Sequence, residues 1–297
     1  MLFRQLEYFV ALARERHFGR AAAAEFVSQP ALSAAISKLE HELDVSLIRR
    51  GHTFQGLTPE GERLVVWARR ILAEHDAFKQ QVHAVRGGLT GRLRLGVIPT
   101  ASTTSIWPVN AFCAAHPLVT VDIQSRLSSE EAHRRLQAFE IDAAITYIDR
   151  EVPSDLLVVP LYEERFVLAV PTDMVPEGAA VSWADIASLP LALVDSKMQS
   201  RQLVDAAFAA AGVEAAPQLE TDSVASLLAA VGTGRWASII PETWTTASGL
   251  PPRLRIIRLE NPAVTGNIGV VISAATPGSP LAVAFAQTAA ELGFESR

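Results

Sequence analysis

The glycine-rich segment Gly-Gly-Leu-Thr-Gly at residues 87–91 divides the chain into two parts with different hydrophobic patterns. Before it, apolar residues recur at intervals of three and four, which is typical of amphipathic helices. After it, short β-type runs alternate with helical stretches. The glycines predict a hinge between two kinds of structure. A chain of 297 residues also exceeds the usual size of one domain, so we expect at least two compact units.

Three short helices are predicted in the first part, over residues 3–16, 20–26 and 29–42. The Ser28 hydroxyl is placed to cap the third helix, and Pro30 fits its first turn, where no amide hydrogen bond is lost. One face of this helix is apolar and is expected to be buried. That face consists of Leu32, Ile36, Leu39 and Leu43.

The opposite face of the third helix is small and polar, with Gln29, Ser33, Ser37 and Lys38. Such a helix fits a major groove, with donors and acceptors near base edges and phosphates. Residues 1–90 carry 12 Lys and Arg against 10 Asp and Glu, whereas residues 91–297 carry 14 against 22. Any nucleic-acid role therefore belongs to the first part. On periodicity alone, a plain helical bundle remains an open alternative.

The order of residues in this part resembles the winged helix-turn-helix of LysR-type transcriptional regulators. The resemblance covers residues 2 to about 64 and is carried by the run FRQLEYFVALARERHFGRAAAAEFVSQPALSAAISKLEHELDVSLIRR, followed by LTPEG. The matching positions are Ala21, Ala22, residues 27–32, Ile36, Leu39, Glu40, Leu43, Leu47, Leu57, Thr58 and Gly61.

The resemblance implies a recognition helix over residues 29–42 and a wing over residues 49–57. Ala34, Ala35 and Gly19 replace residues that are often polar or basic in the family, so we expect few base contacts and more reliance on phosphate contacts and DNA shape. The alternative that Arg49 and Arg50 are only solvent-exposed side chains of a turn, with no contact to DNA, stays open. The expected DNA-binding residues are Ser28, Gln29, Pro30, Ser33, Ser37, Lys38, Arg49, Arg50 and Thr53.

A long helix is predicted after Thr58, which can cap it, with Pro59 in its first turn. Apolar residues then alternate at spacings of four and three for about three heptads, which favours pairing with a second helix. The alternative is that this stripe packs on its own domain. The family resemblance implies a dimer or a tetramer. The expected dimerisation residues are Leu64, Ala68, Ile71, Phe78 and Val82, with His75 and Val85 in the same seam.

The second part is predicted to be an α/β domain with a parallel sheet. It resembles the sensor domain of the same family, which looks like a two-lobed type 2 periplasmic binding protein joined by two crossing strands. We expect domains at residues 1–58, 59–90 and 91–297, with lobe I at 91–161 plus 266–297 and lobe II at 162–265. Strands are expected at residues 92–98, 120–125, 143–148, 165–170, 191–194, 237–240, 254–258 and 268–272, and helices at 103–115, 129–140, 201–211, 223–231 and 280–292.

Ligands of open α/β sheets lie beyond the carboxyl ends of strands, where helix amides favour negative charge. Hydroxyls and an arginine in these loops suit a carboxylate, so we expect a small organic anion as effector. Helix capping is the alternative role for each serine or threonine. The expected effector-binding residues are Thr100, Ser102, Ser128, Thr146, Gln199 and Arg201.

Other function classes find little support. The sequence shows no membrane-spanning apolar stretch and no export signal, and its one cysteine, Cys113, cannot form an internal disulfide, so we expect a cytoplasmic protein. There is no phosphate loop, no nucleophile elbow and no metal-ligand spacing, so we expect no catalytic residues, metal or cofactor. The expected partners are double-stranded operator DNA, the effector, a second copy of the chain and RNA polymerase. An enzyme or a solute-binding protein on the same fold is the rival reading.

Overall fold

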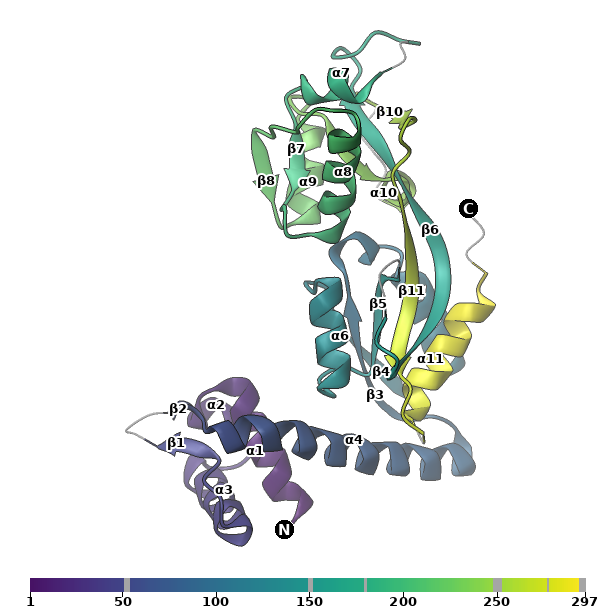
Figure 1. The fold of residues 1–297 in the computed structure, drawn as a ribbon. Coiled ribbons are helices and arrows are strands. Elements are labelled where there is room, and N and C mark those ends of the chain that lie inside the picture. Colours follow the sequence, from purple (N-terminus) through teal and green to yellow (C-terminus); the bar gives the residue numbers. More distant parts are fainter. Residues whose placement is uncertain (51–53, 149–151, 179–180, 248–252, 277, 294–297) are drawn as a thin grey trace.

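The computed structural model shows a helical N-terminal unit joined by one long helix to an α/β unit (Figure 1). The N-terminal unit consists of α1 (Phe3–Glu15), α2 (Phe18–Ala24), α3 (Gln29–Leu43), the antiparallel hairpin of β1 (Ile48–Arg50) and β2 (Phe54–Leu57), and the start of α4 (Pro59–Gly87). The structure describes residues 1–50, 54–148, 152–178, 181–247, 253–276 and 278–293.

The core of the N-terminal unit confirms the apolar face predicted for the third helix. Leu32, Ile36 and Leu39 are at most 1% exposed and pack with residues of α1. Ser28 caps α3, because its hydroxyl accepts a hydrogen bond from the Ala31 amide. Leu43, in contrast, is 39% exposed and lies at the end of the helix.

The first turn of α4 lies directly against the strand hairpin. The Thr58 hydroxyl donates to the Ser46 carbonyl at 2.6 Å and accepts from the Gly61 amide at 2.9 Å. A Cβ atom on Gly61 would lie only 2.1 Å from the Leu47 carbonyl oxygen. The hairpin and the long helix therefore meet only because residue 61 has no side chain.

The long helix ends at the predicted hinge. α4 reaches Gly87, and Gly88 leaves the helix with φ of +117°. Gly91 has φ of +124° and begins β3 (Gly91–Val97). These two backbone conformations favour glycine over other residues. No helix in the described ranges is long and apolar enough to cross a membrane.

The main sheet of the second part is mixed, so the prediction of a parallel sheet is right only for its β3, β4 and β5 part. β3 is parallel to β4 (Val119–Gln124) and β5 (Ala143–Tyr147). β6 (Leu156–Pro171) and β11 (Thr265–Ser273) are antiparallel to each other, and β11 is antiparallel to β5. The upper half of β6 pairs antiparallel with β9 (Ser238–Pro241) and β10 (Leu254–Arg258), while β7 (Ala192–Val194) pairs parallel with β8 (Leu219–Thr221).

The long strands β6 and β11 make the sheet mixed, because every antiparallel pairing in it involves one of them. β6 and β11 run from the lower to the upper part of the α/β unit and join two lobes (Figure 1). Sequence patterns found most of the elements but not α7, α10 and β8, which are too short to show a period. The helices are α5 (Ile106–Ala115), α6 (Ser129–Gln137), α7 (Trp183–Ala187), α8 (Gln199–Ala210), α9 (Val224–Gly232), α10 (Glu242–Ala247) and α11 (Pro280–Glu291), with a short 3₁₀ helix at Pro99–Ala101.

Replacing Gly61 with alanine should destabilise the N-terminal unit. The added methyl group would overlap the Leu47 carbonyl, which is a backbone atom and cannot rotate away. We expect the free energy of unfolding to fall by about 3 kcal/mol, the upper end for overpacking. Urea denaturation followed by circular dichroism measures this loss. The control is Gly19→Ala, whose methyl group would meet the movable His17 ring at 3.2 Å. Equal stability of both variants would contradict this account.

Candidate DNA interface and effector cleft

The polar face of α3 lies on the surface. Gln29, Pro30 and Lys38 are exposed, and Ser33 is half-buried beside them. The Ser37 hydroxyl donates to the Ser33 carbonyl at 2.9 Å, so its proton is engaged within the helix. The face that sequence analysis assigned to DNA is therefore accessible in the structure, with Ser28 at its amino-terminal end.

The strand hairpin is held against α3 by Glu40. Its carboxylate accepts hydrogen bonds from the amides of Leu47 at 2.9 Å and Ile48 at 3.2 Å. Arg49 is exposed on β1. The Arg50 side chain and Thr53, both expected to bind DNA, lie outside the described residues. Sequence analysis placed Glu40 in the family pattern but did not assign it this role, because its partners follow the helix.

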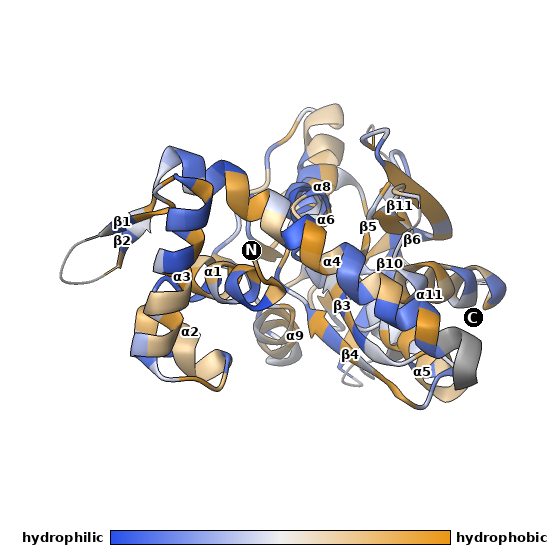
Figure 2. Ribbon diagram, turned by 90° about the horizontal axis from the view of Figure 1, so that it is seen from below, coloured by the Kyte–Doolittle hydropathy of each residue, from blue (hydrophilic) through white to orange (hydrophobic). Residues whose placement is uncertain are grey.

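The apolar residues of α4 serve two surfaces rather than one seam. Figure 2 shows hydrophobic segments recurring along α4. Ala68 is 3% exposed and packs in the N-terminal core, with Leu64 partly buried against it. Phe78 and Val82 are exposed, at 69% and 38%. The first half of the expected dimerisation seam is thus turned inward, because α1 covers it.

A different residue continues the outward stripe of α4. Trp67 is 59% exposed and lies with the partly buried Ile71 and with Phe78 along a shallow hollow of about 470 Å³. Phe3 of α1 borders the same hollow, and its ring stacks on His75 with centroids 4.1 Å apart. The predicted heptad pattern missed Trp67 because it ran through the neighbouring Ala68, which faces the N-terminal core.

A cleft of about 320 Å³ lies between the lobes, where β3 and β5 end and where α6 and α8 begin. Three of the predicted effector residues line it, namely Thr100, Ser128 and Gln199. Sequence analysis missed the charged residues of this cleft. Arg126 and Lys197 precede the two helix starts, and Asp195 and Asp222 also line it.

The other three predicted effector residues are absent from the lining of this cleft. Thr146 is fully buried within β5. The Ser102 hydroxyl donates to the Pro99 carbonyl at 2.7 Å and completes a turn. Arg201 is 6% exposed, because its side chain points back toward the small sheet of lobe II. Their side chains lie outside this lining because a residue near a loop in sequence can still point into the protein, and their role in effector binding stays a prediction.

Arg201 is held by structural contacts. Its guanidinium pairs with Asp205 at 2.8 Å and Glu220 at 2.7 Å and donates to the Val194 carbonyl at 2.9 Å. Burial disfavours the charged form, but the hydrogen bonds to Glu220 and Asp205 outweigh it and raise the pKa of Arg201. Its charge is therefore already satisfied within lobe II.

The back wall of the cleft is a buried polar cluster that connects the lobes. The Tyr147 hydroxyl donates to the carboxylate of Glu164, which is fully buried, and lies 3.4 Å from the Thr100 hydroxyl. Burial and the charge of Glu164 raise the pKa of Tyr147 well above its usual range, so its hydroxyl keeps its proton. Trp244 of lobe II donates to the Thr100 carbonyl at 2.9 Å.

The two helix starts give the cleft an anion-favouring end. Ser128 caps α6 by accepting from the Glu131 amide at 3.1 Å. Met198 occupies the cap position of α8 and gives no side-chain hydrogen bond, so the first amides of α8 lack that partner. Aligned amides at helix starts carry partial positive charge. Arg126 and Lys197 also line the cleft, and Asp195 and Asp222 match their two charges.

Two protein families account for nearly the whole chain. A family described as bacterial regulatory helix-turn-helix protein, lysR family, matches residues 3–62, and the LysR substrate binding domain matches residues 86–293. The chain belongs to the LysR family. It is a DNA-binding transcriptional regulator with an effector-binding domain, which confirms the resemblance seen in the sequence.

Curated relatives of this LysR-type regulator include hydrogen peroxide-inducible genes activators. That of Haemophilus influenzae is 30% identical over 294 residues, which cover 95% of this chain and 92% of the relative. A probable activator of the same description from Mycobacterium xenopi is 39% identical over 170 residues, covering 56% of this chain and 87% of the relative. Both are transcriptional activators and not enzymes.

Solved structures share the fold over nearly the full length. A full-length OxyR variant from Pseudomonas aeruginosa superposes with a TM-score of 0.76 at 25% identity, covering 97% of this chain and 94% of that one. CbnR bound to its target DNA superposes with a TM-score of 0.68 at 24% identity, covering 98% and 99%. The predicted fold class, a helix-turn-helix unit followed by a two-lobed α/β domain, is confirmed, and the periplasmic proteins serve only as an analogy.

Proposed function

We propose that this regulator binds operator DNA as a dimer, or as a tetramer of paired dimers, and changes its DNA binding when a small organic anion enters the cleft between the lobes. The observation that carries the effector class is the meeting of two helix starts with Arg126 and Lys197 in one cleft; Asp195 and Asp222 balance the two side-chain charges, so the helix-start amides supply the preference for an anion. The effector must prefer one conformational state, because a ligand with equal affinity for both shifts neither.

The DNA-binding part of the proposal is supported by the accessible polar face of α3 and by the charge distribution. Residues 1–90 have a net charge of +2, whereas residues 91–297 have −8. Phosphate therefore attracts the N-terminal unit and repels the effector-binding domain. Because the regulator binds operator DNA in this proposal, we expect it in the cytoplasm. RNA polymerase is the further partner that we expect at a promoter.

A peroxide response is the second candidate function, and the names of the relatives favour it. The single cysteine of this chain, Cys113, is half-buried in α5 and is not among the residues that line the cleft. One cysteine cannot close a disulfide within the chain. We therefore favour reversible binding of an anion over thiol oxidation as the sensing chemistry.

We place the dimer contact on the outward stripe of α4. Trp67 and Phe78 are large, apolar and exposed, and such side chains gathered on one face mark an interaction site. Phe3 extends the stripe onto α1. A second copy of α4 packed on this stripe would fix the spacing of two recognition helices, about 34 Å apart or a multiple of that distance.

The first prediction concerns DNA. Fluorescence anisotropy on the regulator's own upstream DNA should show affinity about 10³-fold or more above scrambled DNA, with a steep salt dependence. Arg49→Gln should weaken binding to both DNAs and reduce the salt slope by about one unit. Arg92→Gln, in the effector-binding domain, is the matched control and should change neither. Equal binding of both DNAs by the native protein would refute the regulator's operator recognition.

The second prediction concerns the effector. A panel of small mono- and dicarboxylates, screened by calorimetry, should contain a binder whose affinity falls about tenfold or more in the Arg126→Ala, Lys197→Ala variant, since charged hydrogen bonds are lost. Arg201→Met should lower stability and leave this affinity unchanged. Should DNA affinity respond to hydrogen peroxide and not to carboxylates, with Cys113→Ser removing the response, the peroxide alternative would replace the anion.

The third prediction concerns assembly. The double substitution Trp67→Glu, Phe78→Glu should dissociate the dimer to monomers at micromolar concentration. The reason is that each subunit would bury two negative charges at the contact. Sedimentation velocity measures the change. Leu292→Glu, at another exposed apolar side chain (42%), is the control and should remain dimeric. A double variant with native sedimentation would exclude this stripe as the dimer contact.

A further inference from the structure

One ion pair joins the linker helix to the effector-binding domain. Nη1 of Arg69 on α4 lies 2.8 Å from Oε1 of Glu140 in lobe I, and both side chains are largely buried, at 16% and 24% exposure. Burial lowers the pKa of Arg69, and the charge of Glu140 opposes this shift. The described residues contain no other ion pair between α4 and residues 91–293. Because the pair is desolvated, its geometry is held more firmly than that of a surface pair.

Glu140 is also held at the end of α6. Its carboxylate lies 3.8 Å from Arg134 and 3.7 Å from Arg135, and both arginines pair with Glu131 one turn earlier, at 2.7 and 2.6 Å. These pairs connect successive turns of one short helix. The other end of α6 begins at Ser128 and Ser129, which line the effector cleft. Helix α6 and the loop after it thus span the distance from the cleft to the contact with α4.

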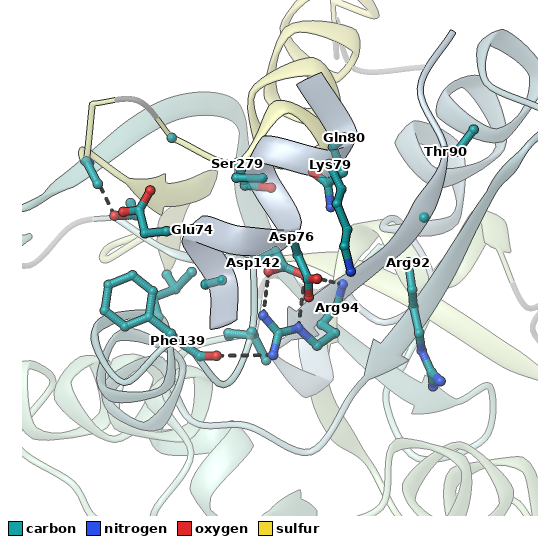
Figure 3. Close-up of a pocket in the computed structure, with 18 of the residues that line it drawn as sticks. Glu74, Asp76, Lys79, Gln80, Thr90, Arg92, Arg94, Phe139, Asp142 and Ser279 are labelled. Carbon is teal, nitrogen blue, oxygen red and sulfur yellow. Dashed lines mark hydrogen bonds and ion pairs between the residues drawn. The ribbon is translucent and has the colours of Figure 1, made fainter. Parts of the chain in front are cut away.

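The loop that carries Glu140 is fixed to the sheet from its other side. Arg94 of β3 pairs with Asp142 at 2.7 Å and donates to the Phe139 carbonyl at 3.1 Å (Figure 3). Burial alone lowers the pKa of Arg94, but the hydrogen bonds and charge of Asp142 reverse the direction. Glu140 therefore moves with lobe I and not independently of it.

Beside this contact, α4 and lobe I are separated by a hollow of about 480 Å³. Glu74, Asp76 and Lys79 of α4 line this hollow together with Arg94 and Asp142, and Figure 3 shows Asp76 beside the Arg94–Asp142 pair. A gap of this size leaves few interdigitated side chains at this place to resist a small displacement. Lobe I can thus shift relative to α4 while Arg69 and Glu140 transmit the movement.

We propose that α6 and the Glu140–Arg69 pair couple the occupancy of the effector cleft to the position of the linker helix, and through it to the two recognition helices. Glu140 and Arg69 are positioning residues in this scheme and touch neither effector nor DNA. The inference rests on the proposed function, since it requires that cleft and operator be linked. Linkage is reciprocal, so operator DNA must change the state of α6 as the effector changes the affinity for DNA.

The test uses hydrogen exchange of the full-length protein, free and bound to its own upstream DNA. In the native protein, DNA should change deuterium uptake in peptides covering residues 126–137, and Glu140→Gln should remove most of that change while uptake in α3 still responds to DNA. Arg69→Gln, which breaks the same pair from the α4 side, should remove it as well. Asp122→Asn breaks the Arg92–Asp122 pair, also in lobe I, and is the matched control.

Several outcomes overturn the coupling. It fails if the native protein binds its upstream DNA specifically without any change in residues 126–137, or if Glu140→Gln keeps the full change. It fails equally if Asp122→Asn abolishes the change as completely as Glu140→Gln, because general softening of lobe I would then explain both. Failure of the proposed function would give a different result from failure of the coupling, because the native protein would then bind upstream and scrambled DNA alike.

Discussion

The antiparallel pairing of β6 with β11 is the constraint on which the α/β domain depends. These strands pair from Leu156 to Arg165 against Ser273 to Thr265 and continue from one lobe into the other. Because the lobes share this ribbon, a cleft forms beside it, where the ends of β3 and β5 face the start of α8. Trp244, bonded to the Thr100 carbonyl, ties the lobes at the base of the cleft. The Tyr147–Glu164 hydrogen bond also joins the lobes, so the shared ribbon and these contacts keep the cleft aligned.

The two parts of the molecule differ in net charge, and we propose different ligands for them. The effector-binding domain has a net charge of −8, yet its cleft contains Arg126, Lys197 and two helix starts. Asp195 and Asp222 line the same cleft, so its positive side chains are matched by negative ones, while the domain as a whole repels DNA phosphate. The N-terminal unit, with its slight positive charge, presents α3 and Arg49 instead.

Different faces of the linker helix α4 make contacts with different parts of the molecule. Ala68 packs into the N-terminal core, Trp67 and Phe78 lie on the surface, and Arg69 reaches lobe I. Since one rigid helix carries all three contacts, a displacement at Arg69 reaches the helix-turn-helix unit without an intervening flexible segment. Gly61 allows the first turn of α4 to pack directly against the hairpin, because it has no side chain.

The sequence by itself determined the helices of the N-terminal unit, the Ser28 cap and most strands, because period and capping are local properties. The order of its residues, through their resemblance to LysR-type regulators, indicated the family. It also placed Thr100, Ser128 and Gln199 at the cleft. Only the tertiary structure decided that the sheet is mixed, that Thr146 and Arg201 are buried, and that α1 covers Ala68. Each of these depends on partners distant in the chain, such as Glu220 for Arg201, and no local pattern records which distant residue a side chain will meet.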